Sequence, residues 1–577
     1  MKFSIILYVK DNKKTLENAL KSIQNQSEED FECLILDDFS NDDSKKIYEE
    51  FCSNDSRFKY IRSEYSSTNL KEKDQAGISV LLNTGIQYST GDLIVFSNGS
   101  NELLQNRLKQ TQIDLSKTPN LDLICFERDF GPEQVKIYSN TSEKTIRDFL
   151  KNGIPDFWAT AFKREFLLKK LPWLFRQPLD KIFDTQFFLT ALSHSCILGW
   201  SSCKVNVDSF KNKNVDKESG ELSTRYLQMF LPNHQNKSSN EFTVLTTFRD
   251  EGFEVEKTVI AVRLNDQNVN IQLVDDASSD DYDYENVAKV FGCDLIRNET
   301  SQGVAGTRCI GVDQIKTPFF IIFDSHMRFK VSDRDFSKKF LKELKKDDAQ
   351  ILYANTIVIG SNTDENHLFR NYTNEDCLAN SSGHNGFLAF GPIYHLKGDA
   401  LDFDTEWCYK FSSEEDRDND ETDAIIETPS ILGATYAMSK RWWNEIRGLQ
   451  NLYYWGSDEP WLSLKTFLLG GRCRMFKNWG IGHLYRSIPT YGVLLSIPVQ
   501  LNRLMIQFVM APSEEVFDHF KKETFKKLSE EDAKELWKTF EKRKSEYEEV
   551  KMWLWTNAVR TIKDVYELNN KPSIERN

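Results

Sequence analysis

The sequence predicts an α/β protein with two tandem domains of mostly parallel sheet and a C-terminal helical extension. Three observations lead to this prediction. The 577 residues are too many for one hydrophobic core. Strand and helix patterns alternate along the chain, which is typical of a parallel sheet. The same order of patterns begins again near residue 242, which indicates an internal duplication of one domain.

The first half begins with a strand, a helix and a second strand. Residues 3–9 form a β-rich apolar run, and apolar residues recur at helical spacing over 16–23. Asp11 and Asn12 are expected to cap that helix. The second strand, over 31–36, ends on the polar run Asp37-Asp38-Phe39-Ser40. Further on, Asn83-Thr84-Gly85 precedes a third strand that is followed by Ser97-Asn98-Gly99.

The second half repeats this order. Strands are predicted over 242–247 and 269–274, with a helix over 254–264 between them. The second of these strands ends on Asp275-Asp276-Ala277-Ser278, as its counterpart ends on two aspartates. A glycine-rich segment then precedes the apolar strand 318–323. Ligands of such sheets bind at the carboxyl ends of the strands, where both Asp-Asp pairs fall.

Composition changes mark the domain limits. The first domain is predicted over 1–210, a polar linker over 211–240, the second domain over 241–490 and a helical extension over 491–577. Lys and Glu recur at helical spacing in the extension, which we expect to pack on the second domain; a partner-binding helix is the alternative. Its apolar positions are Phe517, Phe520, Phe525, Leu528, Leu536, Phe540, Met552 and Trp555.

Charge and apolar patterning narrow the class of protein. The net charge of −14 argues against a nucleic-acid partner, because phosphate contacts need clustered Lys and Arg. No segment reaches the roughly 18 uninterrupted apolar residues of a spanning helix. The ten cysteines include no C-x-x-C pair and are expected to be reduced thiols. We therefore expect a cytoplasmic protein, with peripheral membrane contact as an alternative, and the oligomeric state stays open.

A polar motif follows the strand 318–323 directly. In Phe323-Asp324-Ser325-His326-Met327, the alternate side chains Asp324 and His326 are placed to converge on one metal ion. Transfer of a sugar from a nucleotide diphosphate needs such an ion to neutralise the leaving group. An ordinary polar turn is the alternative for any such tripeptide, but the place of this one in the repeated unit favours the metal site.

Four motifs occur in a fixed order in the second half, and together they resemble a known family. They are Asp324-Ser325-His326, Leu432-Gly433-Ala434-Thr435-Tyr436-Ala437-Met438-Ser439-Lys440, Trp455-Gly456-Ser457-Asp458-Glu459 and Gly480-Ile481-Gly482-His483-Leu484-Tyr485-Arg486. Over residues 242–510 the chain resembles the catalytic domain of polypeptide N-acetylgalactosaminyltransferases and, more loosely, glycosyltransferase family 2. The resemblance implies two tandem Rossmann-like domains of the A-type glycosyltransferase fold.

The resemblance also implies a metal site. Asp324, His326 and His483 correspond to the family's three Mn²⁺ ligands. One carboxylate and two imidazoles leave open positions for diphosphate oxygens on a six-coordinate ion, so Mn²⁺ (or Mg²⁺) is the expected cofactor. A buried, hydrogen-bonded histidine is the alternative for His483.

The donor is expected to be a UDP-sugar, held by residues at the strand ends. Related enzymes hold uracil and ribose with the aspartates at the end of the second strand, and Asp276 is the preferred contact, with Asp275 close behind. A turn-capping Asp pair is the compatible alternative. The full expected donor-binding set is Thr247, Arg249, Asp275, Asp276, Arg308 and Asp324.

Two adjacent carboxylates are the candidate catalytic residues. Asp458 and Glu459 match the family's late acidic motif. In an inverting enzyme one of them would deprotonate the attacking hydroxyl, and in a retaining enzyme it would only position the sugar. Acidic residues that begin a helix are the alternative, since the helix dipole favours them there.

The first half departs from the motifs at two places. It has Ser97-Asn98-Gly99 where the metal motif is expected, with no carboxylate at Ser97 or Gly99, and it has Leu82 where the family often has Arg. A strong Mg²⁺ or Mn²⁺ contact is therefore missing. We expect a noncatalytic domain that scaffolds the enzyme or binds the acceptor; a metal-independent transferase is the alternative.

The sequence therefore predicts a metal-dependent hexosyltransferase of glycan biosynthesis. It would move a sugar, with an N-acetylhexosamine suggested by the resemblance, from a UDP-sugar to a hydroxyl acceptor on a protein or surface glycan. The polar insert 362–428 lies where acceptor recognition is expected. A noncatalytic nucleotide-sugar or glycan-binding subunit of a glycan assembly system is the alternative. A two-site polymerase would need a working first domain, which Ser97 and Gly99 disfavour.

Overall fold

The computed structural model describes most of the chain between residues 1 and 570, and the predicted linker 211–240 lies outside the described residues together with most of the insert 362–428. The described stretches are 1–62, 76–127, 137–138, 144, 146–147, 157–170, 188–189, 191–192, 198–204, 241–328, 335–359, 389–397, 400–409, 425–484 and 496–570. They form two compact units, one up to residue 204 and one from residue 241.

The described strands of the first unit form one sheet in the order β3-β2-β1-β4-β7-β5-β8-β6. They are β1 (Phe3–Val9), β2 (Phe31–Asp37), β3 (Phe58–Arg62), β4 (Leu93–Asn98), β5 (Leu123–Glu127), β6 (Ile137–Tyr138), β7 (Thr160–Lys163) and β8 (Leu198–Lys204). The helices are α1 (Leu16–Gln24), α2 (Ser44–Phe51), α3 (Ala76–Tyr88), α4 (Arg107–Lys117) and α6 (Arg164–Lys170), with a 3₁₀ turn over Phe157–Ala159.

The second unit has a larger sheet in the order β11-β10-β9-β12-β18-β14-β19-β13, with β17 paired to β19, and a separate β15-β16 pair. Its strands are β9 (Phe242–Phe248), β10 (Asn270–Asp275), β11 (Asp294–Arg297), β12 (Phe319–Asp324), β13 (Met327–Arg328), β14 (Gln350–Ile359), β15 (Ala389–Lys397), β16 (Ala400–Tyr409), β17 (Ile425–Thr428), β18 (Thr435–Ser439) and β19 (Arg472–Leu484).

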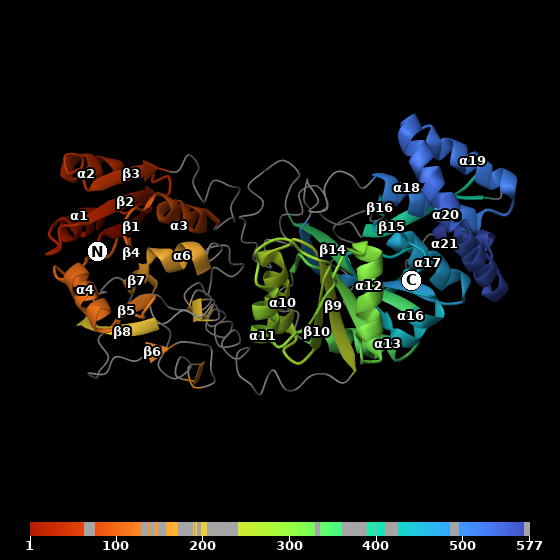
Figure 1. Ribbon diagram of the computed structural model, residues 1–577, viewed down its shortest axis with the longest axis horizontal. Coiled ribbons are helices and arrows are strands. Elements are labelled where there is room, and N and C mark those ends of the chain that lie inside the picture. The colour runs from red at the N-terminus through yellow and green to blue at the C-terminus, as the bar shows by residue number, and fades with distance from the viewer. Residues whose placement is uncertain are drawn as a thin grey trace. The chain divides into compact units, whose positions relative to one another are not determined.

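Helices cover both faces of this second sheet. They are α10 (Phe253–Asn265), α11 (Tyr284–Phe291), α12 (Gly303–Gln314), α13 (Phe336–Leu344), α16 (Lys440–Glu445), α17 (Asp458–Leu468), α18 (Ser496–Met510), α19 (Glu514–Phe525), α20 (Glu530–Asn557) and α21 (Ile562–Asn570). Figure 1 shows β9 between α10 and α12. The predicted fold class, tandem α/β domains with C-terminal helices, is thereby confirmed.

The two sheets have the same arrangement, which supports the internal duplication. In each, the first strand lies between the second and the fourth and is parallel to both, and an antiparallel strand follows. Gly85 of α3 and Gly311 of α12 occupy equivalent places. A Cβ on Gly85 would lie 2.8 Å from Leu36 and 3.0 Å from Ile6, and one on Gly311 would lie 2.6 Å from Leu245 and 3.1 Å from Val274, so glycine at both positions allows close helix–sheet packing.

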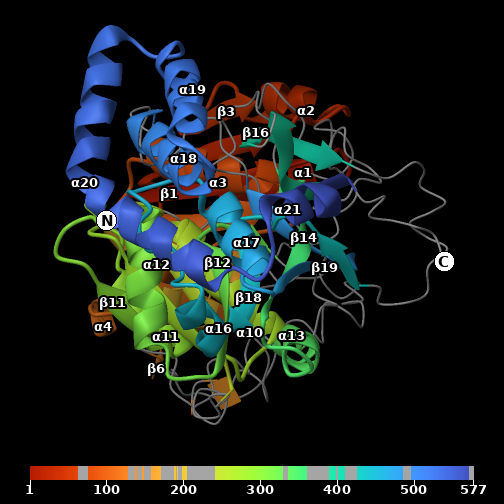
Figure 2. The same cartoon turned by 90° about the vertical axis from the view of Figure 1, so that its right-hand side faces the viewer.

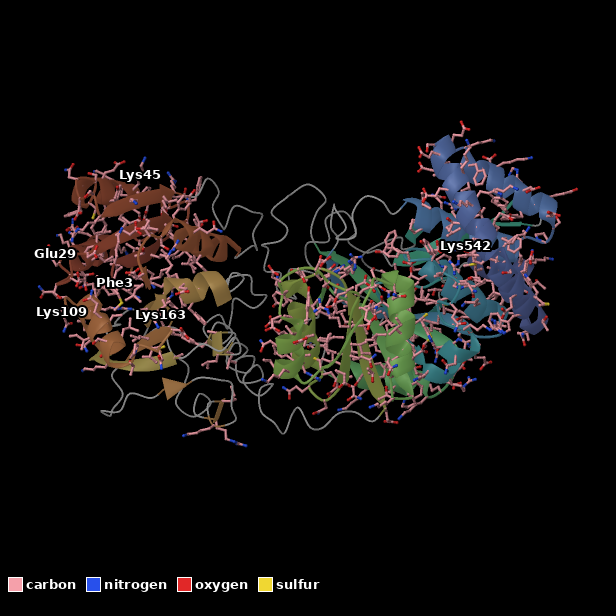
Figure 3. The ribbon with its side chains drawn as sticks, viewed as in Figure 1. Phe3, Glu29, Lys45, Lys109, Lys163 and Lys542 are labelled. Carbon is pink, nitrogen blue, oxygen red and sulfur yellow. The ribbon has the colours of Figure 1, made fainter. Side chains whose placement is uncertain are left out.

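Burial explains why the predicted strands form. In β1 and β9 nearly every side chain is buried, as expected for parallel strands covered by helices on both faces. In Figure 3, Phe3 lies within the first unit, whereas Lys45 and Lys109 lie at its surface. The expected cap of α1 is wrong: Thr15 precedes the helix, and the Asn12 side chain instead contacts Lys10 N–H and Ser100.

The C-terminal helices share one hydrophobic core with the sheet of the second unit. Figures 1 and 2 show α19 and α20 side by side, and the rings of Phe517 and Phe540 stack between them at 5.5 Å. The predicted apolar positions Phe517, Phe520, Leu536 and Phe540 are buried. Met552 is an error of prediction, because its side chain is 67% exposed on the outer face of α20.

Two further expectations concern the membrane and the cysteines. Among the described residues, every helix is too short or too polar to cross a bilayer. The six cysteines whose side chains the structure describes are free thiols, and most of them are buried.

Candidate active site

Three predicted site residues lie at the carboxyl ends of neighbouring strands. Thr247 is the next-to-last residue of β9, Asp275 ends β10 and Asp324 ends β12. The parallel register places Asp324 opposite Thr247 and Asp275 opposite the adjacent Phe248. The sequence patterns therefore place these side chains at one edge of the sheet, where ligands of open α/β sheets bind.

Asp324, His326 and His483 lie together at this edge. One ligand atom from each lies within 4.8 Å of the others. His483 Nε2 is 3.0 Å from Asp324 Oδ2 and 3.1 Å from His326 Nε2. Metal–ligand bonds of about 2.1 Å meeting at right angles place neighbouring ligand atoms about 3 Å apart. The set of one carboxylate and two imidazoles fits a divalent ion, and Mn²⁺ better than Mg²⁺, which prefers oxygen ligands.

Local strand pairing brings His483 to this site although 157 residues separate it from His326. Met327 in β13 pairs with His483 in β19, so the residue just after His326 is bound to the strand that carries His483. Thr258 of α10 fixes the turn that carries His326, because its hydroxyl donates to Ser325 C=O at 2.7 Å and accepts from Met327 N–H at 3.0 Å.

The other ring nitrogen of His326 faces Glu251. His326 Nδ1 is 3.5 Å from Glu251 Oε2 and 3.3 Å from the Ser325 hydroxyl, and Glu251 is buried. A proton on Nδ1 leaves the Nε2 lone pair directed at Asp324 and His483. Glu251 was not predicted as a site residue, because its only signal in the sequence was its position three residues after β9.

Asp324 carries a negative charge at neutral pH. Its partly buried position alone would raise its pKa, but the hydrogen bond from His483 and the positive charge of Arg308 hold the pKa at about 2. Its side chain is 26% exposed. The carboxylate is therefore charged and open to a ligand over the pH range in which proteins work.

Arg308 links the candidate metal ligand to the candidate catalytic residue. It lies on α12 with its side chain only 4% exposed, donates to Asp324 Oδ1 at 2.6 Å and forms an ion pair with Asp458. The ring of Tyr436 lies 5.7 Å from the guanidinium carbon. Arg308 therefore contacts two carboxylates at once, whereas the sequence predicted only a nucleotide contact for it.

Asp458 and Glu459 begin α17, where the helix dipole stabilises negative charge. Burial, the charge of Asp458 and a hydrogen bond to it raise the pKa of Glu459 well above its usual value. Glu459 lies against Gly433, where any Cβ would collide with its carboxyl. Asp458, 13% exposed, forms an ion pair with Arg308.

Asp276 stabilises the start of α12. Its carboxylate accepts four hydrogen bonds, at 2.7–2.9 Å, from the side chains of Asn298 and Ser301 and the backbone N–H groups of Gln302 and Gly303. Asp275 accepts from Ser278 N–H at 2.8 Å, and its other oxygen is 3.4 Å from Arg297. The turn-holding role of both aspartates is visible in these bonds, and their contact with a nucleotide stays a proposal.

Arg249 lies just beyond β9 and contacts the loop before α17. Its guanidinium donates to the Tyr454 hydroxyl at 3.1 Å, and that hydroxyl is also 3.1 Å from Ser301 Oγ. One tyrosine thus joins the end of β9, the start of α12 and the loop that leads to Asp458. Tyr454 carried no signal in the sequence that set it apart from other aromatic residues.

The first unit lacks both halves of the Arg308–Asp324 ion pair. Strand register equates Asn98 with Asp324, since Asn98 pairs with Tyr8 as Asp324 pairs with Thr247. This corrects the predicted alignment by one residue: Asn98 and Ser100, rather than Ser97 and Gly99, stand where Asp324 and His326 do. Leu82 lies three residues before Gly85, and Arg308 lies three residues before the equivalent Gly311. The buried Leu82 therefore corresponds to Arg308.

Two tandem Rossmann-like units, with convergent carboxylates at the strand ends of the second, place the chain in the class of A-type glycosyltransferase folds. The model described as Glycosyl transferase family 2 matches residues 4–177 and 243–406, more than half of the chain. The chain belongs to this family.

Individual relatives are similar only in part. The chain is 32% identical over 107 residues, 18% of its length, to a GalNAc(5)-diNAcBac-PP-undecaprenol β-1,3-glucosyltransferase of Campylobacter jejuni, of which it covers 32%. It is 23% identical over 256 residues, 43% of its length, to polypeptide N-acetylgalactosaminyltransferase 4 of Caenorhabditis elegans, of which it covers 39%. A crystal structure of GalNAc-T7 with UDP, GalNAc and Mn²⁺ is similar at 19% identity and a TM-score of 0.34. The aligned region is 47% of this chain and 48% of the GalNAc-T7 chain.

Proposed function

We propose that the second unit is a metal-dependent glycosyltransferase that moves a sugar from a UDP-sugar to a hydroxyl group. The observation that carries this proposal is the convergence of Asp324, His326 and His483, linked through Arg308 to Asp458. Membership of glycosyl transferase family 2 supports transfer from a nucleotide sugar. The polypeptide N-acetylgalactosaminyltransferase favours an N-acetylhexosamine as the sugar and a protein as the acceptor, whereas the Campylobacter relative favours glucose and a lipid-linked glycan.

Asp324, His326 and His483 would hold the divalent ion, and Glu251 would orient His326. When bound, Mn²⁺ or Mg²⁺ neutralises charge that develops on a diphosphate leaving group. The chain supplies the rest of the donor site: Asp276 keeps Ser301 and the first turn of α12 in place, and Thr247 and Arg249 flank the same edge.

Asp458 is the proposed group that handles the acceptor hydroxyl. A general base must be ionised before it can take a proton, and burial and the charge of Asp458 raise the pKa of Glu459, which disfavours its ionised form. The ion pair with Arg308 fixes the position of the Asp458 carboxylate. The first unit is proposed to be noncatalytic, since Leu82 and Asn98 replace the equivalent arginine and aspartate.

A thermal-shift screen tests donor binding. With Mn²⁺ and UDP together, we expect the melting temperature to rise by about 5–10 °C when the nucleotide is at roughly 100 times its Kd. UDP with a chelator, and GDP or dTDP with Mn²⁺, should give much smaller shifts. Release of UDP from a panel of UDP-sugars then separates a transferase from a binding subunit, which would show the thermal shift without release. The absence of any nucleotide shift would contradict the proposal.

Replacement of Asp458 by Asn tests the choice between the two carboxylates. We expect turnover to fall by a factor of about 10²–10⁴, the usual contribution of a general base, while UDP and Mn²⁺ still bind. Glu459→Gln is the matched variant, because it makes the same carboxyl-to-amide change at the neighbouring residue, and it should lose less than about tenfold. Steady-state UDP release measures both, and a larger loss in Glu459→Gln would reverse the assignment.

A further inference from the structure

Asn502 lies on α18, in the region predicted to be a helical extension, and contacts the loop that precedes Asp458. It is fully buried. Its Oδ1 accepts from Tyr453 N–H at 2.6 Å, and its Nδ2 lies 2.9–3.0 Å from the carbonyl oxygens of Tyr453, Trp455 and Gly456. One side-chain amide thus satisfies the backbone of three of the five residues just before the acidic motif.

This loop needs such external support because of its backbone conformation. Asn451, Tyr454 and Ser457 have φ angles of 76°, 55° and 66°, a region that side-chain-bearing residues seldom adopt, and Gly456 has a φ of 91°. A strained segment keeps one conformation only when the surrounding structure fixes it. Asn502 supplies the buried hydrogen bonds that do so on the side of α18.

The opposite side of the loop contacts the first turn of α12. Tyr454 C=O accepts from Ala305 N–H at 3.2 Å, and Gly303 packs so closely on the Tyr454 backbone that a Cβ there would collide with it. The loop is therefore held between α18 on one side and the start of α12 on the other, and Asp458 follows it directly as the first residue of α17.

The far end of α17 is fixed by the C-terminal helices as well. The Arg560 guanidinium donates to the carbonyl oxygens of Phe467, Gly470 and Gly471 at 2.6–3.2 Å, which satisfies carbonyls at the helix C-terminus. Both ends of the helix that begins with Asp458 and Glu459 are thus anchored from beyond residue 491.

We propose that Asn502 is a positioning residue that sets the place of the Asp458 carboxylate, so that the C-terminal helices are an integral part of the catalytic unit. This inference rests on the proposed function of Asp458. Asn502 is expected to act on turnover and leave donor binding largely intact, because Asp324, His326 and His483 are held by strand pairing that does not involve α18.

Asn502→Ala, made in the full chain, tests the inference. We expect kcat to fall by a factor of about 10–100, since displacement of a catalytic group by ~1 Å has that effect, while KM for the UDP-sugar and Kd for Mn²⁺ change less than about threefold. Gln507→Ala is the matched control: Gln507 is a buried amide of the same helix, and its Oε1 accepts no hydrogen bond from the described residues. That variant should keep its kcat.

Hydrogen exchange gives a second readout that does not need turnover. Amides of residues 453–458 should exchange at least about tenfold faster in Asn502→Ala, and not in Gln507→Ala. If the alanine variant does not fold, Asn502→Ser, which keeps one hydroxyl donor, takes its place with a smaller expected effect. Wild-type kcat in a folded Asn502 variant, or equal losses in both variants, would overturn the inference. An inactive wild-type protein would instead count against the proposed function, and the exchange data would still decide the role of Asn502 in the loop.

Discussion

Asp324→Ala is expected to lower sugar transfer by on the order of 10³-fold, because it removes the only carboxylate of the candidate metal site. The remaining two imidazoles leave the ion without its charged ligand, so its affinity should fall as well. The fold should persist, since Arg308 keeps its contact with Asp458. UDP release at saturating UDP-sugar and Mn²⁺ binding followed by electron paramagnetic resonance measure the two effects.

Asn98→Ala is the matched control for this variant. Asn98 ends β4 at the position that corresponds in register to Asp324, so the two substitutions are made at equivalent places of the two units. Turnover of Asn98→Ala should stay within about twofold of wild type. Equal loss in both variants would mean that the first unit takes part in the chemistry, and unchanged turnover in Asp324→Ala would exclude the proposed metal site.

Arg308→Met is expected to have the largest effect on stability. The substitution keeps most of the side-chain volume but leaves Asp324 and Asp458 as two negative charges without their shared partner. Removal of one member of a buried ion pair lowers the free energy of unfolding by about 3–5 kcal/mol. Urea denaturation with tryptophan fluorescence measures the change for the second unit. Added Mn²⁺ should restore part of the loss, because the cation returns positive charge beside Asp324.

Leu82→Met provides the comparison for Arg308→Met. Leu82 occupies the equivalent helical position in the first unit and is fully buried. Exchange of Leu for Met in a core usually costs less than about 1.5 kcal/mol. A similar stability of the Arg308→Met variant and the wild type would show that the two carboxylates do not depend on this arginine.

Most of the fold followed from local patterns in the sequence. Buried parallel strands are uninterrupted apolar runs, so β1, β2, β9, β10 and β12 lie within a residue or two of the predicted limits. The three candidate metal ligands came from their motifs, and the structure brings them together. Met552 was mistaken for a core residue because an amphipathic pattern of 28 residues tolerates an apolar side chain on its outer face.

The remaining features depend on tertiary contacts that leave no local trace. Arg308 contacts Asp458 across 150 residues, and Asn502 contacts Tyr453 across 49. The one-residue misplacement at Asn98 has a different cause: Ser97 and Asn98 are both polar, and only pairing with β1 shows which of them ends on the ligand side. The raised pKa of Glu459 could not be predicted from the sequence, because it depends on the burial of the side chain in the folded protein.

The joint replacement of Arg308 and Asp324 by Leu82 and Asn98 in the first unit bears on the history of the chain. A buried arginine that loses its carboxylate, or a carboxylate that loses its arginine, is costly to the fold. If the first unit is noncatalytic, as proposed, the loss of one charge alone would have left the other without this partner, which is a reason for both to be absent. Leu82→Arg alone would return the cation without the equivalent of Asp324, and Leu82→Arg with Asn98→Asp would return both members of the pair.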